Sequence, residues 1–209
     1  KLGISSNPFP YKDGIKKDVP VIKVDNTNEE LPLLCSRFYD NPEKKLELIG
    51  VTGTDGKTSV ATIIQYLLGD DTCGYIGTNG LRCKAFSGDT NNTTPDSDKL
   101  FNYFYNFKEA GCKKVVMEVS SEAYFRKRLE TIDYDISVIT NVTSEHLNIH
   151  KTFENYLDCK CGLFRHTKKE GISILNKDDK YYDDILKACN AKNVYTYGMD
   201  KDNTIQIVS

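Results

Sequence analysis

The stretch Gly50-Val-Thr-Gly-Thr-Asp-Gly-Lys-Thr-Ser59 decides the fold of this chain. The apolar run Leu46-Glu-Leu-Ile-Gly-Val51 leads into it and predicts a buried strand, and a helical pattern follows from about residue 57 to 68. Glycines let backbone N–H groups approach phosphate oxygens, and a helix N-terminus favours negative charge. The usual phosphate-loop pattern has glycine where Val51 stands, so the match is to the shorter form Gly53-Thr-Asp-Gly-Lys-Thr. A strand, a phosphate-binding loop and a helix are therefore predicted here, and the alternative is a solvated turn.

Individual side chains of this loop suit the parts of a nucleotide. Lys57 can neutralise phosphate charge, and the Thr58 hydroxyl can hold Mg²⁺. Glu118 ends a later apolar run, where a carboxylate can face the same ion, although a glutamate at a strand end is usually an ordinary surface or cap residue. The residues predicted to bind the nucleotide in this loop are Gly53, Thr54, Asp55, Gly56, Lys57, Thr58 and Ser59.

Strand and helix patterns alternate along the chain. Strands are predicted at 19–24, 46–51, 73–76, 114–119, 135–140, 171–175, 193–197 and 204–208, and helices at 28–39, 57–68, 96–110, 152–164 and 178–189. Residues 1–19 are expected to be irregular. Continuous apolar strands alternating with helices are typical of an α/β fold with a mostly parallel, doubly wound sheet. Such sheets bind ligands at the carboxyl ends of their strands, where the motifs of this chain fall.

Composition excludes several classes of protein. The net charge is −2 with both signs interspersed, which does not favour a nucleic-acid partner, and no apolar run approaches the length of about 20 residues that spans a bilayer. The seven cysteines are odd in number and scattered, as free thiols of a reducing cytosol are. Cys159 and Cys161 could begin a metal site, but no second pair follows. We expect a cytoplasmic monomer with no nucleic-acid partner and no membrane insertion.

A GTPase is the rival nucleotide-binding class. Asn176-Lys-Asp-Asp179 fits the pattern that reads guanine, and Asp71-Thr-Cys-Gly74 fits a second GTPase motif. The second motif lies too close behind the helix of the phosphate loop to leave room for a first switch segment. The sequence therefore disfavours a GTPase.

The order of the motifs resembles that of the Mur ligase family, and within it the UDP-N-acetylmuramoyl-tripeptide synthetases. The resemblance covers about residues 20 to 180 and lies in the phosphate loop and in segments that are similar to family motifs: Asn92-Thr-Thr-Pro-Asp-Ser97, Met117-Glu-Val-Ser-Ser-Glu122 with Arg128, Thr140-Asn-Val-Thr-Ser-Glu-His-Leu-Asn-Ile-His150, Asn155-Tyr-Leu-Asp-Cys-Lys-Cys-Gly-Leu-Phe164 and Asn176-Lys-Asp-Asp179. The last of these matches a family segment near the adenine, which accounts for it without a GTPase.

The resemblance implies a reaction of peptidoglycan synthesis. ATP would phosphorylate the terminal D-Glu carboxylate of a UDP-N-acetylmuramoyl-dipeptide, and the amine of an amino acid would attack the acyl phosphate to form an amide. Two Mg²⁺ ions would offset the repulsion between the two anions. The resemblance implies metal binding by Thr58, Glu118, His146 and Lys160, the last as a carbamate, and catalytic roles for Lys57, Lys160 and His146.

Further roles follow from the same resemblance. Asn141, Asn176 and Asp179 would line the nucleotide. Asn92, Thr93, Thr94, Ser120, Arg126 and Arg128 would bind the muramoyl-peptide. We expect His150 to be a satisfied or exposed histidine and not a ligand. Departures from the family pattern are Glu122 in place of histidine, Arg126 in place of glutamine, and Glu145 and Asn148 in place of the usual acids.

Family ligases have three domains, and the sequence predicts an incomplete set. Residues 1–43 are expected to be a remnant of the domain that binds the uridine end of the substrate, and residues 44–209 the central ATP-binding domain, with the third domain absent. We expect this chain alone to be inactive, because closure of the third domain completes the site. The alternatives are a non-catalytic or partner-dependent nucleotide-binding subunit and a related folylpolyglutamate or cyanophycin-type ligase.

Overall fold

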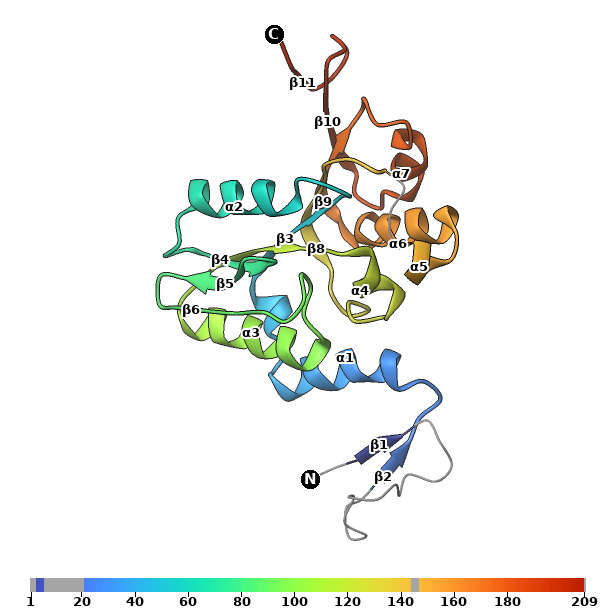
Figure 1. Ribbon diagram of the computed structural model, residues 1–209. Coiled ribbons are helices and arrows are strands. Elements are labelled where there is room, and N and C mark those ends of the chain that lie inside the picture. Colours follow the sequence, from blue (N-terminus) through green and yellow to red (C-terminus); the bar gives the residue numbers. More distant parts are fainter. Residues whose placement is uncertain (1–2, 6–20, 144–146, 209) are drawn as a thin grey trace.

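A computed structural model describes residues 3–5, 21–143 and 147–208 (Figure 1). Its main feature is a nine-stranded sheet in the order β11-β10-β9-β8-β3-β7-β4-β5-β6. Only β5 and β6 run antiparallel to their neighbours in that sheet. The strands are β3 (Glu47–Thr52), β4 (Cys73–Gly77), β5 (Gly80–Cys83), β6 (Phe86–Gly88), β7 (Lys114–Glu118), β8 (Tyr134–Ile139), β9 (Thr167–Asn176), β10 (Asn193–Gly198) and β11 (Ile205–Gln206). The prediction of a mostly parallel sheet is confirmed.

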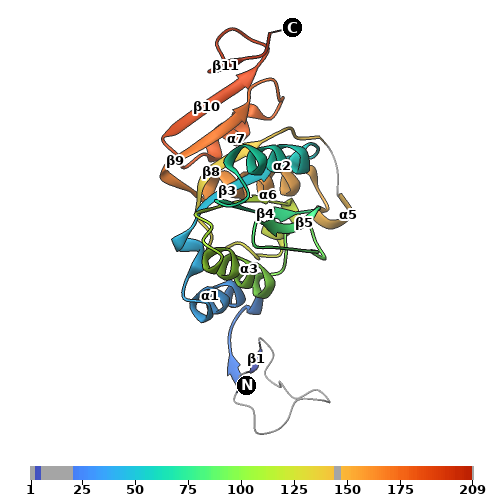
Figure 2. The same ribbon diagram turned by 90° about the vertical axis from the view of Figure 1, so that its left-hand side faces the viewer.

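Helices cover both faces of the sheet. They are α1 (Thr27–Phe38), the 3-10 helix η1 (Pro42–Lys45), α2 (Lys57–Leu68), α3 (Ser97–Glu109), α4 (Ser121–Phe125), α5 (Leu147–His150), α6 (Phe153–Arg165) and α7 (Tyr182–Ala188). Helix α2 lies on one face, whereas α3, α4, α6 and α7 pack on the other (Figures 1 and 2). Helix α1 packs against α3, outside these layers.

Alternation along β3 divides the core into two clusters. Leu48 joins the larger cluster with the aromatic residues of α3 and α6, while Ile49 and Val51 join the smaller one beneath α2. Successive side chains of a strand point to opposite faces, so a fully covered strand must be apolar at every position. This explains why the central strands are continuous apolar runs and not alternating ones.

Most predicted elements are present, and the differences are local. The prediction of an irregular segment at 1–19 is wrong at Gly3–Ser5, which forms β1 and pairs in parallel with β2 (Val21–Lys23). The hairpin strands β5 and β6 and the short helices α4 and α5 were not predicted. All seven cysteines are free thiols. No helix in the described part of the chain is long and apolar enough to cross a membrane.

Candidate nucleotide and substrate site

The phosphate loop lies between β3 and α2, at the carboxyl end of the sheet. Gly53 and Gly56 have φ values of +143° and +80°, a region that favours glycine. A side chain on Gly53 would also collide with the Thr140 hydroxyl. Lys57 Nζ folds back over the loop and donates to the carbonyl oxygens of Gly53 at 2.9 Å and Thr54 at 2.7 Å. The loop therefore has the backbone shape and the positively charged group that phosphate binding requires.

Glu118 meets this loop from the neighbouring strand β7. Its side chain is fully buried, and Oε2 accepts a hydrogen bond from Thr58 Oγ1 at 2.8 Å. The other donors are Tyr75 Oη at 2.5 Å and Thr78, whose backbone N–H lies 3.0 Å from Oε1 and whose hydroxyl lies 3.1 Å from Oε2. Burial, and next the hydrogen bond to Glu118, raise the pKa of Tyr75 to about 12, so the phenol stays protonated and donates. The structure thus joins Thr58 and Glu118, the two residues predicted to bind the first Mg²⁺.

This pair of oxygen ligands fits a magnesium ion. Glu118 forms no ion pair with any residue that the structure describes, so neutral donors alone meet its buried charge. A buried carboxylate without a cation is costly, and a bound cation would offset that cost. The described residues contain no cluster of three or more His, Cys, Asp or Glu side chains suited to a metal. Mg²⁺ often binds through one or two carboxylates together with substrate phosphates, so such a cluster is not needed.

A pocket of about 310 Å³ opens beside the phosphate loop. Lys57 lines it together with five residues predicted to bind the muramoyl-peptide, namely Asn92, Thr93, Thr94, Ser120 and Arg128. The Thr94 hydroxyl donates to the Glu118 carbonyl at 2.9 Å, and Thr93 Oγ1 lies 3.0 Å from Thr78 Oγ1. Hydrogen bonds therefore connect the wall of this Lys57 pocket to the strand end that holds Glu118.

Two arginines follow α4, and they differ in position. Arg128 lines the Lys57 pocket, donates to the Thr94 carbonyl at 3.2 Å and pairs with Asp96 at 2.7 Å. Arg126 is not among the lining residues, and it pairs with Glu122 at 2.6 Å. Two of the departures from the family pattern, Glu122 and Arg126, thus form one ion pair, and the role predicted for Arg126 stays a prediction.

The residues predicted around the nucleotide base are held by backbone groups. Asn141 accepts from the Asp55 N–H at 3.0 Å and donates to the Asp55 carbonyl at 3.2 Å, which ties it to the phosphate loop. Asp179 accepts from the Val142 N–H at 2.6 Å, and Asn176 donates to the Thr140 carbonyl at 2.8 Å. These contacts place all three residues around the ends of β8 and β9, next to the loop.

Lys160 lies within α6 and is only 3% exposed. Its Nζ lies 4.6 Å from the centre of the Tyr156 ring, and Tyr156 Oη lies 2.9 Å from the Thr54 hydroxyl of the phosphate loop. The structure therefore brings Lys160 close to the loop through Tyr156, from a helix about a hundred residues later in the chain.

The structure describes only one of the two histidines in the Thr140–His150 segment. His146, and Glu145 beside it, lie outside the described residues. His150 is fully buried, with Nε2 at 3.0 Å from Ser121 Oγ, and it lines the Lys57 pocket. The expectation of a satisfied or exposed His150 agrees with the structure in its first alternative, and the expectation that His150 is not a ligand stays a prediction.

The sheet topology excludes a nucleotide-binding role for the second GTPase motif, Asp71-Thr-Cys-Gly74. Asp71 precedes β4, whose first residue Cys73 is in register with Lys114 at the start of β7. Asp71 therefore lies at the amino ends of the strands, opposite the phosphate loop, where it cannot contact a nucleotide. Asp179 of the other motif uses both carboxylate oxygens to accept backbone N–H groups, those of Val142 and Tyr181.

Sequence reasoning missed Tyr75 and Thr78 as partners of Glu118. No motif marks them, because the contact depends on how β4 lies beside β7 and not on spacing within either strand. The lining roles of Asn91, Ser121 and Ile149 were also missed. Their closeness to predicted residues in the sequence was the only available signal.

The family follows from a comparison with known protein families. Residues 51–208 match the family model described as the Mur ligase middle domain. The chain belongs to the Mur ligase family. The prediction from the motifs is confirmed, and the match begins at the last residues of β3, where the phosphate loop starts.

Two curated relatives of this Mur ligase chain share one name. The UDP-N-acetylmuramoyl-L-alanyl-D-glutamate–2,6-diaminopimelate ligase of Bacillus cereus is 38% identical over 200 residues, which cover 91% of this chain and 40% of that protein. The ligase of the same name from Lactiplantibacillus plantarum is 37% identical over 214 residues, covering 98% and 42%. The chain thus spans about two fifths of the length of the curated relatives it matches.

Solved structures show the same fold. A structure of a UDP-N-acetylmuramoyl-L-alanyl-D-glutamate–2,6-diaminopimelate ligase superimposes with a TM-score of 0.79 at 26% identity, covering 96% of this chain and 41% of that one. The MurF ligase of Thermotoga maritima in complex with ADP gives a TM-score of 0.63 at 18% identity, covering 90% and 40%. At that lower identity the likeness shows the fold alone.

Proposed function

We propose that this chain is the ATP-binding part of a ligase that adds the third amino acid to UDP-N-acetylmuramoyl-dipeptide in peptidoglycan synthesis. The observation that carries the proposal is that Lys57 belongs both to the phosphate loop and to the pocket lined by the predicted substrate residues. One cation thereby faces both reactants. The names of the Bacillus cereus and Lactiplantibacillus plantarum relatives support this reading and argue against a folylpolyglutamate-type ligase.

The proposed reaction has two steps. A carboxylate oxygen of the dipeptide forms a bond to the γ-phosphorus of ATP, the bond to the β-phosphate oxygen breaks, and ADP leaves. The amine of the amino acid then attacks the acyl carbon, loses a proton, and releases phosphate as the amide forms. Lys57 and Arg128 contribute positive charge where two anions must meet. The pocket holds the substrate carboxylate in line with the phosphoryl group that it attacks.

Metal binding is proposed at two places. Thr58 and Glu118 would hold one Mg²⁺ beside the phosphates, and His146, as neutral imidazole, and Lys160 would serve a second. When bound, these ions would neutralise charge on the transferring phosphoryl group. An ammonium beside a metal would be repelled, so we propose that the Lys160 amine adds CO₂ with loss of a proton and becomes an anionic carbamate. The position of Lys160 supports this, since its side chain is 3% exposed and lies beside Tyr156, which contacts the phosphate loop.

Product formation by the whole protein tests the proposal. ATP, Mg²⁺ and UDP-N-acetylmuramoyl-L-Ala-D-Glu are supplied with 2,6-diaminopimelate, lysine or another amino acid in separate reactions. The expected result is one ADP for each amide, and a product heavier than the substrate by one amino-acid residue. ATP binding without product from any amino acid would favour a non-catalytic nucleotide-binding subunit.

A further inference from the structure

The Glu118 carboxylate is held on the side away from Thr58 by a buried tyrosine. Tyr75 Oη donates to Oε1 at 2.5 Å, and both side chains are fully buried. The Thr78 backbone N–H donates to the same oxygen at 3.0 Å. Two donors therefore fix Oε1, and this orients Oε2 toward the Thr58 hydroxyl at 2.8 Å.

Gly77 makes room for this hydrogen bond. A Cβ atom at this position would collide with Glu118 Oε1 and with Tyr75 Oη. Gly77 does not have a positive φ, so the backbone conformation is one that any residue adopts. What this position requires is space, and the atoms that use the space are those of the Tyr75–Glu118 hydrogen bond.

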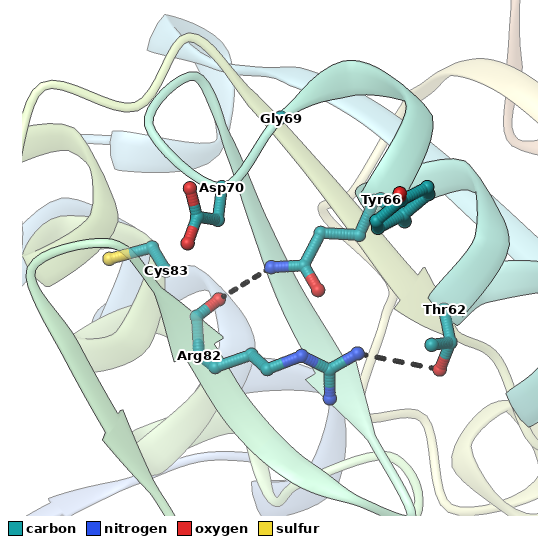
Figure 3. A pocket seen from close by; sticks show the side chains of 7 residues that line it. Thr62, Tyr66, Gly69, Asp70, Arg82 and Cys83 are labelled. Carbon is teal, nitrogen blue, oxygen red and sulfur yellow. Dashed lines mark hydrogen bonds between the residues drawn. The ribbon is translucent and has the colours of Figure 1, made fainter.

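The Tyr75 ring is backed by Arg82 from the antiparallel hairpin. Tyr75 on β4 and Arg82 on β5 are direct partners in the ladder, and the guanidinium carbon lies 3.9 Å from the ring centroid. Figure 3 shows Arg82 reaching across a second pocket, with one guanidinium nitrogen 3.4 Å from the Thr62 hydroxyl. Such a stack contributes an attraction that keeps the ring from rotating away.

We propose that Tyr75 is a positioning residue for the metal-binding carboxylate and that Arg82 holds Tyr75 in place. Tyr75 acts through Glu118, so that Glu118 Oε2 and the Thr58 hydroxyl form a preset pair of oxygen ligands. The inference rests on the proposed function, because it requires Glu118 to face Mg²⁺. Partners that orient a metal ligand typically change metal affinity by about 10- to 100-fold when they are removed.

Tyr75→Phe tests the role without removing the ring. The affinity of the 209-residue chain for a non-hydrolysable ATP analogue is measured by calorimetry with and without Mg²⁺. Tyr75→Phe is expected to lower the affinity in Mg²⁺ about tenfold and to leave the metal-free affinity unchanged. Arg82→Gln is expected to act in the same direction by about two- to fivefold. A purely structural role would lower stability in urea and leave the Mg²⁺ effect intact.

Tyr134→Phe is the matched control. Tyr134 is equally buried, and its hydroxyl contacts Met117 Sδ at 3.8 Å instead of Glu118, so its loss should not change the Mg²⁺ effect. If Tyr75→Phe keeps the wild-type Mg²⁺ effect while Glu118→Gln abolishes it, the positioning role is overturned and the proposed function stands. If the wild-type chain shows no Mg²⁺ effect at all, both fail.

Discussion

At the scale of single residues, the site is built around one buried negative charge. Glu118 is fully buried and surrounded by four hydrogen bonds from neutral donors, of which the Tyr75 bond at 2.5 Å is the shortest. In the absence of a cation this arrangement lowers the stability of the fold. Buried charges that lower stability are characteristic of functional sites.

Glu118→Gln should therefore stabilise the metal-free protein. Glutamine keeps the shape of the side chain and removes the charge, so we expect the free energy of unfolding in metal-free buffer to rise by about 1 kcal/mol, or about 2–4 °C in melting temperature. The Mg²⁺-dependent part of nucleotide binding should disappear. Thermal melting and calorimetry measure the two effects.

Glu43→Gln is the control for this experiment. Glu43 lies in η1, away from the phosphate loop, and it is also buried, at 3% exposure. Its carboxylate accepts a hydrogen bond from Ser36 Oγ at 2.7 Å. The Glu43→Gln substitution should leave the effect of Mg²⁺ on nucleotide binding unchanged. A Glu118→Gln variant that melts earlier and still responds to Mg²⁺ would contradict a metal-binding role for Glu118.

Lys160 should carry a carbamate when bicarbonate is present. In bicarbonate buffer near neutral pH, native mass spectrometry of the intact chain should show the added mass of one CO₂, which acidification removes. Lys160→Arg should abolish the addition, because a guanidinium does not form the carbamate, whereas replacing the exposed Lys84 should not. An unmodified amine in both the mass and an electron-density map would contradict the carbamate.

Single residues also mark the limit of sequence reasoning about the site. Lys57 and Thr58 were found because a contiguous loop pattern names them. Tyr75 and Thr78 lie about forty residues before Glu118 and meet it only because β4 pairs with β7. No spacing within the sequence encodes that contact.

At the scale of elements, the turn between β3 and α2 is the part that glycine controls most tightly. Gly53 and Gly56 both have positive φ, but they differ in surroundings. A Cβ on Gly53 would collide with Thr140, whereas one on Gly56 would have no neighbour closer than 3.7 Å. The two positions therefore separate the effect of backbone conformation from that of crowding.

Substitution by alanine tests this difference. Gly56→Ala should lower the free energy of unfolding by about 1 kcal/mol and weaken nucleotide binding, because only the backbone is strained. Gly53→Ala adds a collision and should lower the free energy of unfolding by several times as much. Urea denaturation measures both, and equal losses would contradict the role assigned to the Thr140 contact.

The elements with strong local signals were the ones predicted well. Helix α2 was predicted at its observed bounds, since a glycine-rich loop fixes its start and Gly69 its end. Strands β5 and β6 were missed because they are short. In addition, β6 is the edge strand of the sheet and shows little apolar pattern. Helix α4 was missed because five residues are too few to show a helical period.

At the scale of the whole molecule, the site is assembled from segments far apart in the chain. The phosphate loop follows β3, Glu118 is the last residue of β7, and Asn141 follows β8; these three strands are adjacent in the sheet. Parallel strands bring their carboxyl ends to one edge, so the alternation of strand and helix was enough to predict that these residues gather. The residues that line the Lys57 pocket could be predicted only with the family resemblance as well.

The chain by itself is expected to bind nucleotide and not to complete the reaction. It spans about two fifths of its curated relatives, and we propose that the remaining parts of such a ligase contribute to the substrate and nucleotide contacts. Titration should show binding of ATP with Mg²⁺ and much weaker binding of GTP, with no amide product. Steady, substrate-dependent phosphate release by this chain alone would contradict the expectation.

We propose that the phosphate loop and the Lys57 pocket form one site in which a carboxylate is phosphorylated. The most direct measurement labels the D-Glu carboxylate of the dipeptide substrate with a heavy oxygen isotope and follows the label in a complete reaction with the whole protein. We expect one labelled oxygen in each phosphate released, because the acyl phosphate leaves a carboxylate oxygen on phosphorus. Amide formation with unlabelled phosphate would contradict it.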